Sequence, residues 1–305
     1  MSQLIAGVAR AAVLATLRIS IYTGRKRDNR TQAEVVQDKH ARSARAASVY
    51  KALFADCKEL DDIIRLQAMA RKRHYTLTLP WDDNGPRLLP VLALQDYQQE
   101  LEDYQQRFET LVQTFLDKYD TLVAAAAFQL GALFDRAEYP SRAQVAKSFA
   151  FNVEYTPVPM AGDFRLDIES EVQQDLAKQY EQRIARQLED AQQDAWERVY
   201  EALKRFQDRL TLNEDGTRKV FHETMVTNAQ ELCDVLTTLN VTKDPALEKA
   251  RQQLQNLLAG VDVKELRKFD EARSDTLEKV NRILDAFDWG VETENEETDD
   301  TGDRI

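Results

Sequence analysis

Apolar and polar residues alternate in three short stretches that lie far apart in the chain. The first, Leu17–Thr23, ends at Gly24, while Tyr75–Leu79 and Phe149–Tyr155 each end close to a proline. Alternation among branched and aromatic side chains is typical of β-strands. Because a lone strand leaves its backbone groups unpaired, we expect the three predicted strands to pair with one another in one small sheet.

Two long stretches without proline have the spacing of α-helices. Apolar residues in steps of three and four predict a helix from Leu94 to about Phe134, and a second helix is predicted from about Asp167 to Leu210. The apolar stripe of the second helix drifts because its mean spacing exceeds 3.6 residues. The first helix carries a heptad seam, which we take as a candidate helix interface and which consists of Leu94, Tyr97, Leu101, Tyr104, Phe108, Leu111 and Phe115.

Shorter helices fill most of the remaining chain. Two are expected between Gln32 and Arg73 with a join near Cys57–Asp61, and three more follow residue 212. These last three are predicted at Arg218–Leu239, Pro245–Gly260 and Val263–Phe287.

The predicted fold is therefore mainly α, with two long antiparallel helices, a small three-stranded sheet made of distant segments, and a C-terminal helical region. The long helices would form either a helical stalk or an elongated bundle, and two helices of a compact bundle explain the pattern equally well. We expect three parts: a domain of residues 1–212, a helical region of residues 213–290, and a disordered acidic tail of residues 291–305.

Charge is distributed unevenly along the chain. The formal net charge is −12 at pH 7, yet residues 1–73 contain 15 Lys and Arg against 7 Asp and Glu. A first basic cluster, made of Arg25, Lys26, Arg27 and Arg30, directly follows Gly24, and a second is made of Arg71, Lys72 and Arg73. Both clusters are candidate contacts for an acidic partner or for nucleic acid. A solvated loop is the simpler explanation of the first.

Other chemistry finds little support in the sequence. The two cysteines and three histidines are scattered, and His222-Glu223 lacks the second histidine of a metalloprotease helix. Phosphate-binding glycine loops and nucleophile elbows are absent from the sequence. We therefore expect no catalytic residue, no cofactor and no metal site. No apolar run is long enough to cross a membrane, so a cytoplasmic location is expected.

The order of these features resembles one known family. A strand followed by Gly24-Arg25-Lys26, an alanine-rich helix, a glutamine-rich long helix and Ser148-Phe149-Ala150-Phe151 are similar to the phage and prophage family of domain of unknown function 3150. The resemblance covers about residues 14–212. It implies a tailed-phage protein whose gene lies near those of a MoxR-type AAA ATPase and a von Willebrand A-type protein.

Two hypotheses for function follow. The first is a nonenzymatic helical protein that binds other proteins, either as an adaptor to the ATPase and von Willebrand A pair or as a homo-oligomer formed through the seam. The second is a nucleic-acid-binding phage protein that uses the basic first 73 residues. The net charge of −12 and the isoelectric point near 4.9 favour the first.

Overall fold

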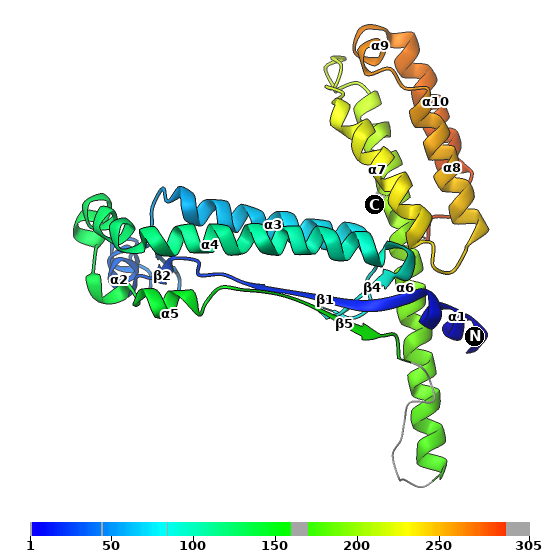
Figure 1. Ribbon diagram of the computed structural model, residues 1–305. Coiled ribbons are helices and arrows are strands. Elements are labelled where there is room, and N and C mark those ends of the chain that lie inside the picture. Colours follow the sequence, from blue (N-terminus) through cyan, green and yellow to red (C-terminus); the bar gives the residue numbers. More distant parts are fainter. Residues whose placement is uncertain (1, 44, 84, 160–169, 291–305) are drawn as a thin grey trace, which may run out of the picture. The chain divides into compact units, whose positions relative to one another are not determined.

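The computed structural model describes residues 2–43, 45–83, 85–159 and 170–290, and it is mainly α-helical (Figure 1). Its helices are α1 Ser2–Ala11, α2 Asn29–Asp38, α3 Lys58–Leu77, α4 Leu94–Leu130, α5 Arg142–Ala146, α6 Ser170–Leu210, α7 Glu223–Leu239, α8 Pro245–Ala259, α9 Val263–Lys268 and α10 Asp270–Asp285. Its strands are β1 Ala12–Ser20, β2 Arg25–Arg27, β3 Tyr50–Ala52, β4 Arg87–Pro90 and β5 Ala150–Pro157.

The chain divides into two compact units, and each is built from segments that are not contiguous in the sequence. The first unit contains Met1–Leu14, Thr78–Leu92 and Pro157–Ile305, and the second contains Ala15–Leu77 and Ala93–Thr156. The predicted boundary near residue 212 falls between α6 and α7, which both belong to the first unit. The predicted acidic tail, residues 291–305, lies outside the described residues.

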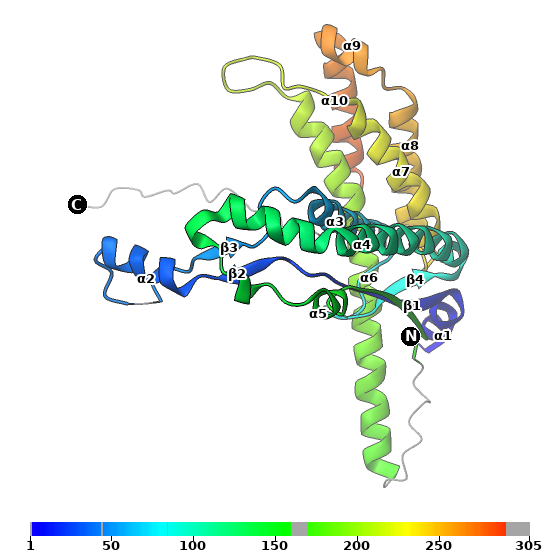
Figure 2. The ribbon, with the colours of Figure 1, turned by 60° about the vertical axis from the view of Figure 1, so that its left-hand side comes forward.

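The second unit is built on a pair of long helices. α3 and α4 run side by side in both views (Figure 1 and Figure 2), and α5 also packs against α4. An aromatic cluster fills the space beside them, where Phe54 contacts the rings of Phe115, Tyr119 and Tyr139 at centroid distances of 5.4 to 5.7 Å. β2 and β3 pair as a two-stranded antiparallel sheet.

The first unit is a helical bundle around α6. Helices α7, α8 and α10 pack against α6, α8 contacts both α7 and α10, and α1 also touches α6. The α6 stripe of Ala195, Val199 and Leu203 is at most 1% exposed and forms the centre of the core. The predicted apolar stripe of α6 is buried from Ile184 to Leu210, where several neighbours cover it, whereas Leu176 and Tyr180 are only partly buried.

A three-stranded sheet of distant segments is present, as predicted, with strand order β4-β1-β5. One of its three predicted strands is wrong. Tyr75–Leu77 continue α3, because His74 and Leu77 lie one helical turn apart and are both buried. The strand that joins the sheet is β4, which follows the turn after Trp81.

The predicted antiparallel pairing of the two long helices is not confirmed. α4 packs against α3 and α5, whereas α6 packs against α7, α8 and α10. The last predicted helix, Val263–Phe287, is interrupted at Phe269, whose extended backbone separates α9 from α10.

Candidate functional site

The first basic cluster lies where the chain leaves β1 and enters β2, the first strand of the short β2–β3 pair. Gly24 adopts a φ of +59°, and a Cβ built there would lie 3.1 Å from Leu60 and 3.2 Å from Phe54. Only glycine combines this backbone conformation with such close packing. The chain then forms β2, in which Lys26 is paired with Lys51 of β3 and Arg27 with Tyr50.

Three of these basic residues line a cavity of about 690 Å³. Lys26 and Arg27 come from β2, Arg30 comes from the first turn of α2, and Lys51 joins them from β3. The turn after α4, residues 132–135, closes the opposite side. The lining also contains four acids, Asp28, Glu34, Asp135 and Glu138, so its formal charges sum to zero. We call this site the basic pocket after its four cations. Arg25 lies beside it on β2 but is not part of its lining.

Several charges in the basic pocket are already paired within the chain. Lys51 Nζ lies 2.9 Å from the carbonyl oxygen of Leu133 and 2.5 Å from a carboxylate oxygen of Glu138. Arg27 donates two hydrogen bonds to the side-chain oxygen of Gln32, at 3.0 and 2.9 Å. Within the described part of the chain, the side chain of the exposed Arg30 has only a 3.5 Å contact with Glu34.

Asp28 positions α2 at the edge of the basic pocket. Its carboxylate accepts hydrogen bonds from the backbone N–H groups of Arg30 and Thr31 and from the hydroxyl of Thr31. These hydrogen bonds, those from Thr31 first, hold the pKa of Asp28 below its usual value. Asp28 thus caps two of the backbone N–H groups at the start of α2, and the cations of the pocket are all side chains.

Two cations at the basic pocket have no partner of opposite charge among the described residues. Among the described residues, the side chains of Arg25 and Lys26 make no hydrogen bond or ion pair, and both are exposed. Exposed apolar residues lie near them: Tyr50 is 62% exposed and Leu133 is 46% exposed. Arg25, beside the lining, and Lys26, within it, therefore place positive charge next to apolar area, which suits an acidic ligand that also carries apolar or aromatic groups.

The second basic cluster belongs to the internal structure of its unit. Arg71 donates to the carbonyl oxygen of Ile19 at 3.0 Å, and Arg73 forms a two-pronged pair with Glu100 at 2.5 and 2.7 Å. Lys72 is exposed on α3. This cluster begins eleven residues after Leu60, about 16 Å along the helix from the part of α3 that meets Gly24. Trp81, which follows this cluster closely in the sequence, is buried in the core of the other unit.

The heptad seam is the internal core of the second unit. Tyr97, Leu101, Phe108 and Phe115 are at most 3% exposed, while Leu94, Tyr104 and Leu111 are partly buried. Phe108 packs on the rings of Phe149 and Phe151 at 6.3 and 5.7 Å, and the Tyr97 hydroxyl lies 2.7 Å from Nδ1 of His74. The apolar partner that the seam requires is therefore the same chain.

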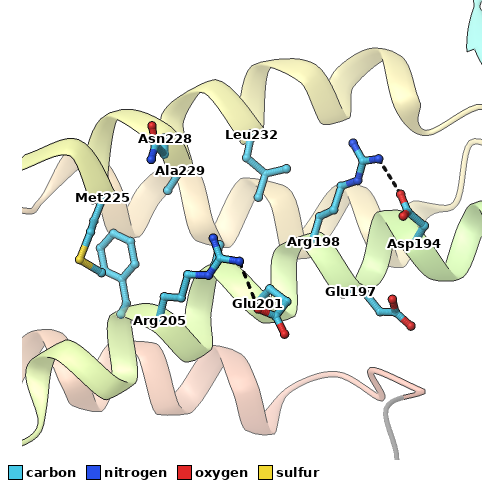
Figure 3. A pocket seen from close by; sticks show the side chains of 11 residues that line it. Asp194, Glu197, Arg198, Glu201, Arg205, Met225, Asn228, Ala229 and Leu232 are labelled. Carbon is cyan, nitrogen blue, oxygen red and sulfur yellow. Dashed lines mark hydrogen bonds and ion pairs between the residues drawn. The ribbon is translucent and has the colours of Figure 1, made fainter. Parts of the chain in front are cut away.

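Sequence reasoning missed a groove between α6 and α7 (Figure 3). A cavity of about 390 Å³ lies there above Ala202 and Phe206 of α6 and Ala229 and Leu232 of α7. Arg198 pairs with Asp194 at 2.7 Å and donates to the carbonyl oxygen of Thr78 at 2.8 Å. The apolar stripe of α6 predicted its buried face, but it carried no signal for a groove beside that face.

The cysteine thiols lie in surroundings that suppress their reactivity. Cys57 and Cys233 are both unpaired and buried, and burial raises the pKa of Cys233 to about 11 and also raises that of Cys57. Among the described residues no group of three or more His, Cys, Asp or Glu side chains is arranged to hold a metal ion. Within the same residues, no helix combines the length and apolarity needed to cross a lipid bilayer.

Comparison with known proteins identifies the family. No curated protein and no solved structure matches the chain. The family model described as "Protein of unknown function (DUF3150)" matches residues 10–264. The match extends beyond the region of resemblance expected from the sequence, because it includes α7 and α8. The chain thus belongs to the DUF3150 family of proteins of unknown function.

Proposed function

We propose that the protein is a nonenzymatic phage-type binding protein whose basic pocket receives an acidic segment of a partner protein. The observation that carries this proposal is the pair of uncompensated cations, Arg25 and Lys26, next to the exposed Tyr50 and Leu133. Protein interfaces favour aromatic and arginine side chains together. An acidic segment with apolar residues would satisfy both features of the pocket.

The resemblance described above suggests the first partners to test. A MoxR-type AAA ATPase and a von Willebrand A-type protein encoded near the gene are the candidates, and the chain would act as an adaptor between them. The encounter would take place in the host cytoplasm, which the two unpaired cysteines favour.

Charge reversal at the pocket tests this function. The full chain is mixed with each purified candidate partner, and the mass of the mixture is measured by light scattering. We expect a complex whose affinity falls at least roughly tenfold in Lys26→Glu/Arg30→Glu and declines with added salt. The matched control, Arg65→Glu/Arg107→Glu, reverses two exposed charges elsewhere in the same unit and is expected to bind normally. Absence of a complex with either partner, or equal loss in both variants, would contradict the proposal.

Nucleic acid is the second candidate ligand of the same pocket. Tyr50 lies directly across the strand pair from Arg27, so a cation and an aromatic ring stand together as in single-strand binding sites. Fluorescence anisotropy with a labelled single-stranded oligonucleotide separates the two functions. Nucleic-acid binding predicts a steep salt dependence and loss of affinity in Tyr50→Ala. If the chain binds a partner protein but not the oligonucleotide, nucleic-acid binding is excluded and the first function is supported.

A further inference from the structure

The groove between α6 and α7 has opposite charges at its two ends. Its lining continues past Arg205 and Met225 into a second cavity that is bordered by Lys204, Asp208 and Arg209. The half at residues 194–201 holds Asp194, Glu197, Arg198 and Glu201, with a net charge of −2. The half at residues 204–209 holds Lys204, Arg205, Asp208 and Arg209, with a net charge of +2.

Some of these charges pair within the chain, but the two ends of the groove still differ in the sign of their charge. Arg205 contacts Glu201 at 3.3 Å, and Asp208 contacts both Lys219 at 2.6 Å and Arg209 at 3.5 Å. Glu197 is exposed and accepts only a 3.3 Å hydrogen bond from the neutral Gln193. Lys204 likewise donates to the neutral Gln207 at 2.7 Å. Each end therefore keeps a charge of its own sign for an external partner.

The floor between the two ends is apolar and shallow. Phe206 and Ala229 are buried, whereas Ala202, Met225 and Leu232 are only partly covered. Ala202 lies near the midpoint of the groove along α6, and its small side chain allows another backbone to approach closely. Figure 3 shows that α6 and α7 run in opposite directions along the groove, and the α7 residues beside its apolar floor extend from Met225 to Leu232.

We propose that a second copy of this chain covers the groove, with the two copies related by a two-fold axis that lies in the interface between them, perpendicular to α6 and level with Ala202. This symmetry reverses the direction of the second α6, so the acidic half of each copy faces the basic half of the other. Such an interface is isologous, because the same surface serves on both subunits. A parallel arrangement would oppose like charges and is disfavoured.

The size of the groove indicates how strongly the two copies are expected to bind each other. Fifteen residues of helix extend about 23 Å, and two adjacent helices are about 20 Å wide, which gives roughly 450 Å² per copy. Stable interfaces bury about 800 Å² per partner. The dimer is therefore weak and transient, and it dissociates as salt screens the charge pairs.

Complementary charge swaps test the symmetry directly. Sedimentation velocity is measured on the full chain, on Glu197→Lys/Glu201→Lys, on Lys204→Glu/Arg209→Glu, and on their equal mixture at low salt. Each variant alone opposes like charges and is expected to weaken the dimer at least roughly tenfold. The mixture restores both sets of opposite charges, so a heterodimer as strong as the wild-type dimer is expected.

The control reverses two acids on an exposed helix face, Glu271→Lys/Glu278→Lys on α10, and should keep the wild-type dimer. Circular dichroism verifies that each variant is folded. A wild-type chain that is monomeric at about 200 µM and low salt, a dimer unaffected by either swap, or a mixture that stays monomeric would each overturn the proposal. The surface is separate from the basic pocket, so this result is independent of the partner-binding test.

Discussion

A buried arginine closes the end of the helical bundle in the first unit. Arg273 is 3% exposed, and its guanidinium donates to the carbonyl oxygens of Leu266, Arg209 and Lys219. These carbonyls lie at or near the ends of α9, α6 and the segment before α7, where helices leave acceptors without partners. Burial lowers the pKa of Arg273, which shows that the surrounding protein resists its charge.

We predict that Arg273→Lys destabilises the protein although it keeps the charge. A lysine ammonium lacks the planar fork of donors with which arginine reaches all three carbonyls. At least one buried acceptor therefore loses its partner, at a cost of about 1.5–3 kcal/mol. Urea unfolding followed by tryptophan fluorescence measures the change. Arg282→Lys on the same helix is the control, because that exposed residue pairs only with Glu278. Equal stability of the two variants would contradict the role of Arg273.

The thiols provide a second residue-scale prediction. Because burial holds the pKa of Cys233 at about 11, little thiolate is present at about pH 8, and the side chain is also inaccessible. We expect neither Cys57 nor Cys233 to react with iodoacetamide within minutes in the folded protein, and both to react in denaturant. Mass spectrometry of the alkylated protein counts the modified thiols. Rapid native labelling of Cys233 would show that α7 and α8 separate readily.

Basic residues in the sequence do not reveal which of them are free. Arg71, Arg73 and Lys26 all carry a positive charge, yet only Lys26 lacks a partner among the described residues. The distinction depends on Ile19 and Glu100, which lie 52 and 27 residues away along the chain. The sequence thus located both basic clusters, but it could not show that Arg71 and Arg73 of the second have an internal role.

At the scale of elements, long periodic helices are predicted well and short alternations poorly. α4 begins at Leu94 as predicted, and α8 has the predicted Pro245 start and Gly260 cap. Five alternating residues at 75–79 fit a strand and a helix end equally, and the contact between His74 and Tyr97 favours the helix. The break at Phe269 could not be predicted, because no glycine or proline marks it in the sequence.

The seam of α4 leads to the third prediction. Phe108→Ala removes a buried ring that packs on Phe149 and Phe151, and this leaves a cavity that costs about 3–5 kcal/mol. Because the seam is internal, the variant should lower the unfolding midpoint without changing the mass of the native protein. Gln106→Ala, on the exposed face of the same helix, should change stability by less than about 0.5 kcal/mol. A change of mass with unchanged stability would instead place the seam between chains.

At the scale of the whole molecule, sequence periodicity cannot show which segments share a core. Val8 and Ala12 lie in one apolar core with α6 and with Leu79 and Trp81, although long stretches of the second unit separate these segments in the chain. Local pattern locates each element but carries no information about such distant pairings. The predicted domain of residues 1–212 therefore includes segments from both units.

The two units allow their stabilities to be measured separately. All three tryptophans, Trp81, Trp196 and Trp289, lie in the first unit, so tryptophan fluorescence follows that unit alone, while circular dichroism follows the helices of both. Each unit buries its own apolar residues, and multidomain chains commonly depart from two-state unfolding. We predict that Phe108→Ala shifts part of the circular dichroism transition to lower denaturant and leaves the fluorescence midpoint unchanged. Equal shifts of both signals would mean that the units unfold as one cooperative body, because destabilising the second unit would then also unfold the first.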